Sequence, residues 1–254
     1  MAEIQNQPVR SRDAQRTREI ILDAAQAAFA EHGYDGARIQ AIARASGYNI
    51  SLLFQYFTDK TGLYAAVLQR ADQELNALLE KILAPWLSNT ETILDAQGFQ
   101  AFLQALVRTT FDYMVEHPHL LRIITWEMAE GWSSYLAVAS YGGSASMGGG
   151  ASAFTAGESE PVKTLFRTAM DAGLLRSDFF PMIQLTLVLN LCQSYCASLP
   201  LYRMILSGED IASPSSLALA REYLTKLVVA GMMADPSLRS TPAKRIEKKE
   251  INHD

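Results

Sequence analysis

Apolar residues recur every three or four positions through most of this chain, which is the spacing of one face of an α-helix. The first such stretch runs from Ser11 to about His32, and Gly33 is placed to end it. Further helical stretches are expected over residues 59–85, 97–116, 120–136, 159–173, 181–206 and 213–233. No alternation of strands and helices is visible, so we predict an all-α fold of about nine helices.

Residues 38–56, RIQAIARASGYNISLLFQY, are the most informative stretch of the chain. Ile42 and Ala43 lie on one face of a short helix, and the small Ala43 lets a second helix cross close to its backbone. Gly47 can take the positive φ of a sharp turn, and Asn49 suits the cap of the helix that follows. Two short helices joined in this way form the helix-turn-helix that places its second helix in a DNA major groove.

The residues on both sides of this motif make it specific. TREIILDAAQAAF at 17–29 leads to GY at 33–34, and QYFTDKTGL at 55–63 overlaps and follows the motif. Over roughly residues 14–67 the chain resembles the DNA-binding domain of the tetracycline-repressor (TetR) family of transcriptional regulators. Three positions depart from the usual family pattern, in which a capping Thr, a Lys and a phosphate-binding Tyr stand at the places of Ala37, Ile50 and Phe54.

The resemblance implies an N-terminal three-helix DNA-binding domain and a larger C-terminal helical domain. The larger domain would bind a small-molecule effector and form a homodimer through its last two long helices. Such a protein is a transcriptional regulator, most simply a repressor that binds a palindromic operator in double-stranded DNA and is released by its ligand. A regulator controlled by another protein, an activator, and a helical ligand carrier or enzyme stay open as alternatives.

Candidate DNA contacts follow from the motif. Gln and Asn can pair bidentately with adenine, and apolar side chains can contact a thymine methyl group. The polar side chains best placed for base edges are Gln40, Asn49, Ser51 and Gln55. The candidates for thymine methyl groups are Ile50 and Leu52. The candidates for phosphate contacts are Arg38, Tyr56 and Lys60, with Phe54 at the position of the family's phosphate-binding Tyr.

Composition divides the chain into further segments. We predict a disordered arm at 1–10, the DNA-binding domain at 11–58, and an effector-binding and dimerisation domain at 59–236, followed by a charged tail at 237–254. Residues 140–157 hold six glycines in 18 positions, which predicts a flexible Gly/Ser loop.

The net charge of −5 belongs to the larger domain. Residues 1–60 hold seven Lys or Arg and seven Asp or Glu, whereas residues 61–254 hold 15 and 20. No apolar run is long enough for a membrane span, and the first residues lack the apolar centre of a signal peptide. Cys192 and Cys196 suit reduced thiols, so we expect a cytoplasmic protein.

Aromatic and methionine side chains cluster in the helices expected over residues 97–136. Most should belong to the core, but some would line an effector cavity, because pockets between helices are apolar with a few polar anchors. The candidate ligand-binding residues are Tyr113, Met114, Arg122, Trp126, Glu127 and Trp132. No metal-ligand or catalytic motif accompanies the four histidines, so we expect no metal, no cofactor and no enzyme activity.

Overall fold

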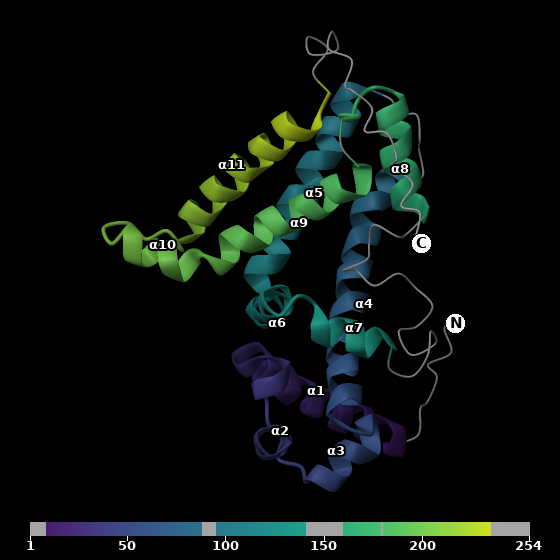
Figure 1. Ribbon diagram of the computed structural model, residues 1–254, viewed down its shortest axis with the longest axis vertical. Coiled ribbons are helices and arrows are strands. Elements are labelled where there is room, and N and C mark those ends of the chain that lie inside the picture. The colour runs from purple at the N-terminus through teal and green to yellow at the C-terminus, as the bar shows by residue number, and fades with distance from the viewer. Residues whose placement is uncertain (1–8, 88–94, 141–159, 179, 235–254) are drawn as a thin grey trace, which may run out of the picture.

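The computed structural model describes residues 9–87, 95–140, 160–178 and 180–234. Within these ranges all regular structure is α-helical, apart from one isolated bridge between Leu175 and Met233, which confirms the all-α prediction. No described helix combines the length and apolar character that crossing a bilayer requires. The helices are α1 Val9–Gly36, α2 Ile39–Ser46, α3 Ile50–Phe57, α4 Lys60–Leu87, α5 Ala96–Glu116, α6 Pro118–Ala129, α7 Ser133–Ser140, α8 Glu160–Asp171, α9 Pro181–Ala197, α10 Leu199–Ile205 and α11 Pro214–Met232 (Figure 1).

Three predicted segments fall almost wholly outside the described residues. They are the arm at 1–10, the glycine-rich loop at 140–157 and the charged tail at 237–254. Their predicted disorder therefore stays a prediction, as does the division of the chain after residue 58.

Helices α1, α2 and α3 pack around a small core at one end of the molecule (Figure 1). Helix α1 bends at Gly33, whose φ of 68° is left-handed, and the chain then makes one further turn to Gly36. The glycine predicted to end the first helix therefore changes its direction. The main buried side chains of this core are Ile21, Leu22, Phe29, Ile42, Leu53, Phe57, Leu63 and Tyr64.

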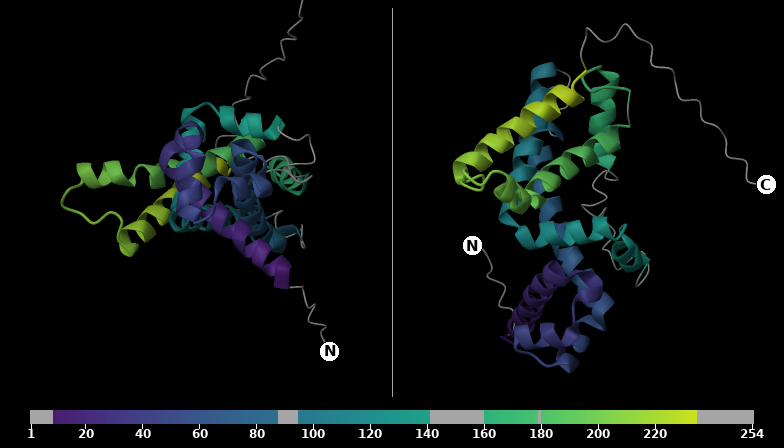
Figure 2. Two further views of the ribbon diagram at one scale, coloured as in Figure 1. Left: turned by 90° about the horizontal axis from the view of Figure 1, so that it is seen from below. Right: turned by 60° about the vertical axis from the view of Figure 1, so that its left-hand side comes forward.

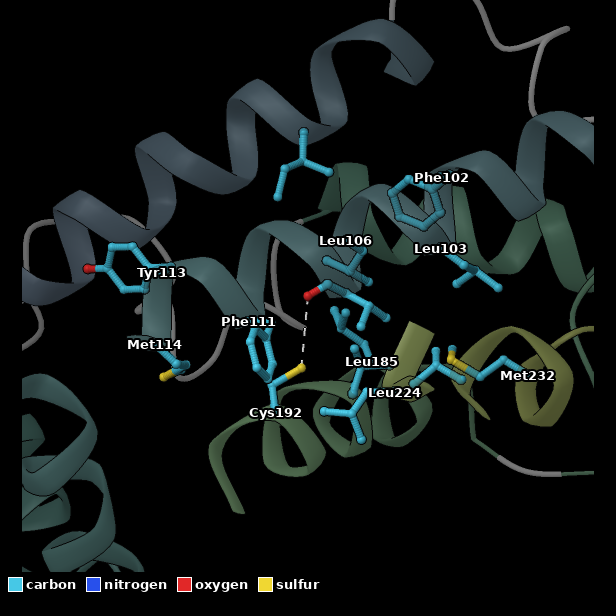
Figure 3. Packing of buried hydrophobic residues seen from close by; sticks show 14 of the residues in the cluster. Phe102, Leu103, Leu106, Phe111, Tyr113, Met114, Leu185, Cys192, Leu224 and Met232 are labelled. Carbon is cyan, nitrogen blue, oxygen red and sulfur yellow. Dashed lines mark hydrogen bonds between the residues drawn. The ribbon is translucent and has the colours of Figure 1, made fainter. Parts of the chain in front are cut away.

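A second and larger core surrounds α5. Helices α4, α9 and α11 pack against α5, and α8 packs against α9. Figure 3 shows the side chains that meet there, among them Phe102, Leu106, Phe111, Leu185, Cys192, Leu224 and Met232. Burial raises the pKa of the Cys192 thiol to about 12 and that of Cys196 to about 11, so both thiols are protonated and unreactive at neutral pH.

Helix α4 takes part in both cores. Leu63 and Tyr64, near its start, are buried against α1, whereas Ala71 and Ile82 belong to the core around α5. Arg70, between these groups, holds α4 to α1 through a 2.7 Å ion pair with Asp23. One helix that runs through both cores (Figure 1) links α1, α2 and α3 mechanically to the rest of the described chain.

Two of the predicted helices are each broken into two, so the described residues form eleven helices rather than about nine. The helix expected over 120–136 stops at Ala129, because Gly131 and Trp132 take left-handed φ values of 65° and 63°. The helix expected over 181–206 is interrupted at Ser198, and Pro200, which has no N–H to donate, lies in the first turn of α10.

Helix α6 joins the two cores through a buried carboxylate. Glu127 is 2 % exposed. Its Oε1 accepts a 2.5 Å hydrogen bond from the Tyr64 hydroxyl of α4, and its Oε2 accepts a 3.0 Å bond from the backbone N–H of Tyr135 in α7. Burial and this carboxylate raise the pKa of Tyr64 far above its ordinary value, so the hydroxyl keeps its proton and remains a donor.

Removing the Tyr64 hydroxyl should destabilise the protein while leaving its fold intact. Tyr64→Phe deprives the buried Glu127 carboxylate of one donor, and a hydrogen bond to a charged group contributes on the order of 1.5–3 kcal/mol. We expect the free energy of unfolding to fall by about this amount, measured by urea denaturation followed by circular dichroism.

Tyr202→Phe is the matched control for this measurement. The Tyr202 hydroxyl lies in α10 and has no hydrogen-bond partner among the described residues, so its removal should leave the unfolding free energy nearly unchanged. An equal loss of stability in both variants would show that the bond to Glu127 is not the cause.

Candidate functional site

The turn between α2 and α3 has the geometry expected of a helix-turn-helix. Gly47 ends α2 with a left-handed φ of 77°, and its N–H caps the carbonyls of the last turn. Asn49 then starts α3, because its side-chain oxygen accepts a 2.8 Å hydrogen bond from the backbone N–H of Leu52. Both local predictions, the glycine turn and the asparagine cap, are confirmed.

Burial divides α3 into an inner and an outer face. Leu53 and Phe57 are buried in the N-terminal core. Ser51, Phe54 and Gln55 are exposed and, being three and four residues apart, form one outward stripe on the helix. Phe54 is an apolar residue, yet its side chain is 41 % exposed and so belongs to this outer stripe. Ile50, Leu52 and Tyr56 lie half-buried at its edges.

The remaining candidate DNA contacts lie at the starts of α2 and α4. Arg38 and Gln40 are exposed, and Arg38 occupies the N-cap position of α2 without capping it through its side chain. Lys60, the first residue of α4, is held in place: its ammonium lies 4.8 Å from the centre of the Tyr34 ring and donates a 3.2 Å hydrogen bond to the carbonyl of Asp35.

The corner between α3 and α4 is closed by a glycine. A Cβ atom added to Gly62 would lie 2.1 Å from the carbonyl oxygen of Phe57, so no other residue fits there without moving the backbone. The side chain of Asp59 also accepts a 2.8 Å hydrogen bond from the N–H of Gly62. The direction of α3 relative to α4 is therefore fixed by local geometry.

A cavity of about 560 Å³ lies between α5, α6, α9 and α10. Of the predicted ligand-binding residues, Met114, Arg122 and Trp126 line it. Its other walls come from neighbouring positions of α5 and α6 and from the distant residues Cys196, Ala197, Leu199, Pro200 and Arg203. Sequence reasoning missed this second wall, since nothing local indicates that α9 and α10 face α6. The lone Arg203 in the apolar run LPLYRMIL was the only signal available.

The other three predicted ligand residues lie away from the cavity lining. The Tyr113 hydroxyl donates a 3.3 Å hydrogen bond to Glu74, and its ring stacks on His117. Glu127 accepts the hydrogen bond from Tyr64 described above. Trp132 packs edge-on against the Tyr135 ring.

The cavity wall is bonded directly to helix α1. The guanidinium Nε of Arg122 donates a 2.8 Å hydrogen bond to the carbonyl of Ala30 in α1, and the indole N–H of Trp126 donates a 3.3 Å bond to the same oxygen. The Trp126 ring also lies so close to Gly33 that an added Cβ would be 3.1 Å from it. A molecule in the cavity therefore touches the same side chains that hold α1.

Comparisons with known proteins agree with this arrangement. Residues 21–67 match the family described as bacterial regulatory proteins, tetR family. The HTH-type transcriptional repressor SCO4008 of Streptomyces coelicolor is 33% identical over 120 residues, which cover 47% of this chain and 54% of that protein. The HTH-type transcriptional repressor NicS of Pseudomonas putida is 31% identical over 119 residues, 47% of this chain and 51% of NicS.

This chain thus spans about half the length of the curated relatives it matches. Similarity to a solved structure extends further. The structure of SCO4942 from Streptomyces coelicolor is 25% identical with a TM-score of 0.55, and the match covers 85% of this chain and 98% of that one. The likeness therefore includes the larger helical part as well as the helix-turn-helix.

Alanine at Gly47 should destabilise the helix-turn-helix through its backbone alone. Gly47 has a φ of 77°, and a Cβ there would meet no atom within 4 Å, so strain of the left-handed conformation is the whole effect. We expect Gly47→Ala to lower the free energy of unfolding by about 1–2 kcal/mol in urea denaturation.

Gly208→Ala controls for the loss of a glycine. Gly208 is equally open to an added Cβ, but its φ lies outside the left-handed range. This variant should be neutral or slightly stabilising. A loss at Gly208 equal to that at Gly47 would contradict the assignment of the effect to the turn.

Proposed function

We propose that this chain is a DNA-binding transcriptional repressor of the tetR family, because residues 21–67 match the model of that family. It acts as a homodimer on a palindromic operator and is released by a small molecule. The observation that carries this proposal is the outward stripe of Ser51, Phe54 and Gln55 on a helix whose direction is fixed at both ends.

In this proposal α3 enters the major groove. Gln55 and Ser51 read base edges, and the Phe54 ring contacts thymine methyl groups or the sugar backbone. The side-chain oxygen of Asn49 is occupied by its cap, so its amide nitrogen is the group left for an acceptor on DNA. Arg38 and Lys60 bind phosphates and set the position of α3 without specifying sequence.

The proposed dimer forms through α9 and α11. These helices and α10 project from the body of the molecule (Figure 1 and the left view of Figure 2). Ten of the sixteen exposed large apolar side chains among the described residues lie between Phe180 and Leu227. On α11 these are Leu219, Tyr223 and Leu227, spaced four residues apart on one face, and α9 presents Ile183 and Leu187 in the same way. Several exposed apolar side chains on one helix face are typical of surfaces that a partner covers, and a two-fold axis would pair each face with its copy.

The cavity between α6 and α10 supplies the switch. Its lining residues Arg122 and Trp126 hold the carbonyl of Ala30, so a ligand that moves them changes the position of α1 relative to the larger domain. In a dimer this motion alters the spacing of the two reading helices. Ligand and operator then favour different states, and each lowers the affinity for the other by the same factor.

Operator binding should depend on the outer stripe of α3 and on salt. DNA from immediately upstream of the gene, titrated by fluorescence anisotropy at several salt concentrations, should bind with a log–log slope of about −0.9 per neutralised phosphate. Gln55→Ala should lose on the order of 1–3 kcal/mol of binding and relax preference at one base pair. Arg38→Ala should weaken all sequences alike and reduce the slope by about 1.

Gln100→Ala is the control for these variants, since Gln100 lies on an exposed position of α5, outside the helix-turn-helix. It should bind the operator as the unaltered protein does. Unchanged affinity in both Gln55→Ala and Arg38→Ala would remove α3 and the start of α2 from the DNA interface.

The dimer should dissociate when charge is placed on the α9–α11 face. Leu187→Glu combined with Leu227→Glu buries two carboxylates in each subunit's half of the interface, at a cost of several kcal/mol per buried ion. We expect a monomer in analytical ultracentrifugation, with loss of operator binding. Leu136→Glu, at a 60 % exposed position on α7, should remain dimeric. A double variant that stays dimeric would place the interface elsewhere.

A further inference from the structure

We propose that the cavity between α5, α6, α9 and α10 binds an organic acid, with an apolar aromatic or acyl body and one carboxylate. The inference deepens the proposed function, on which it rests for its regulatory consequence, by naming the chemical class of the ligand. It is carried by the charges, the burial and the bonding of the residues that line the cavity.

The charge of the lining is one-sided. Two arginines, Arg122 and Arg203, line the cavity, and none of the described residues that line it is acidic. Two other arginines in the same half of the chain are paired with carboxylates: Arg108 with Glu222 at 2.9 Å and Arg221 with Asp112 at 2.7 Å. Neither cavity arginine has an acidic partner among the described residues. A guanidinium binds a carboxylate through two parallel hydrogen bonds, so the site favours an anion.

The inner and outer ends of the cavity differ in burial and in polarity. Met114, Leu121 and Cys196 are buried and form the inner part of the lining, whereas Arg122 and Arg203 are exposed to solvent. The inner end therefore accepts an apolar group, and the two guanidinium groups lie at the solvent-exposed end. This polarity matches a molecule with one apolar end and one charged end, and it disfavours a polar or cationic ligand.

The free donors fit a single negative charge. Arg203 makes no hydrogen bond or ion pair within the described residues, so its whole guanidinium is available. Arg122 already gives its Nε–H to the carbonyl of Ala30, which leaves its terminal nitrogens. One free and one partly engaged guanidinium suit a carboxylate, and the ring of Trp126, which also lines the cavity, offers a flat apolar surface to the body of the acid.

A bound acid would act on the contact between α6 and α1. A carboxylate bound by the terminal nitrogens of Arg122 and by Arg203 pulls the Arg122 guanidinium toward the cavity, and this displacement strains the bond from its Nε–H to the Ala30 carbonyl. Charged acceptors form the stronger hydrogen bond, so the ligand weakens one of the bonds between α6 and α1. An uncharged analogue of the same shape fills the cavity without this pull on Arg122.

The experiment compares matched acids and amides on the full-length protein. The probes are 2-naphthoate with 2-naphthamide, indole-3-acetate with indole-3-acetamide, and octanoate with octanamide, each titrated by calorimetry up to millimolar concentration. We expect at least one acid to bind about tenfold or more tightly than its amide, which is the effect of about one charge-assisted bond pair. If every amide binds as well as its acid, or if no acid binds, the assignment is wrong.

Variants locate the bound acid. Arg203→Gln is chosen because Arg203 is exposed and bonds to nothing in the described chain, so the fold and the α6–α1 contact should survive. It should weaken the acid about tenfold and leave its amide unchanged. Arg167→Gln, which removes an exposed arginine from α8, is the control for net charge and should have no effect. Ala129→Trp fills the cavity and should abolish binding of both compounds. Acid binding that is unaffected by both Arg203→Gln and Ala129→Trp would overturn the proposal.

Operator titrations without ligand separate this inference from the proposed function. A protein that binds its operator but shows no preference for acids refutes the ligand class and leaves the repressor intact. A protein that binds acids through Arg203 but binds no operator refutes the repressor and leaves the ligand class intact. Saturation with the acid should lower operator affinity more than saturation with its amide, and equal effects would contradict the role of Arg122.

Discussion

The buried carboxylate of Glu127 is the constraint on which the arrangement of the two cores depends. An uncompensated buried charge costs several kcal/mol, so its two oxygens must find donors. They find them on two other helices, the hydroxyl of Tyr64 in α4 and the first turn of α7 at Tyr135. Helix α6 can therefore meet α4 in few orientations only. The break at Gly131 and Trp132 belongs to the same constraint, because it turns α7 back so that the N–H of Tyr135 reaches the carboxylate.

Around this fixed point α6 offers different side chains to different neighbours. Ile123 is buried with α1 and α4, whereas Leu120, Leu121 and Ile124 are buried in the core around α5. Between these rows Arg122 and Trp126 reach the last part of α1 and also line the cavity. A single twelve-residue helix thus contacts both cores and the proposed ligand. The proposed coupling between the cavity and the N-terminal helices needs no long chain of intermediates, because the same side chains touch both.

The sequence predicted best where the physics is local. The positive φ of Gly47 and the cap at Asn49 depend on residues within one or two turns, and the structure confirms both. The sequence failed where a helix pattern continues across a break. Apolar spacing through Gly131 and through Pro200 looks uninterrupted, and only tertiary contacts decide that the chain turns there.

The cavity was the hardest part to predict, since its walls come from segments more than 60 positions apart in the chain. Residues on one helix cannot reveal which face is turned toward a partner helix. Glu127 and Arg122 are near neighbours on α6, yet Glu127 points into a buried joint and Arg122 toward the cavity. A pattern of residue types gave both the same prediction, and only the packing of α6 against α4 separates them.

The closed corner at Gly62 bears on how such a protein can acquire a new target. The backbone there admits one geometry, because a side chain at this position would strike the carbonyl of Phe57. The side chains of the three outward residues of α3 take no part in that corner and are exposed to solvent. Ser51, Phe54 and Gln55 can therefore be exchanged in evolution without changing the direction of α3 relative to α4. The outer side chains of α3 can therefore change while the backbone geometry at Gly62 stays the same.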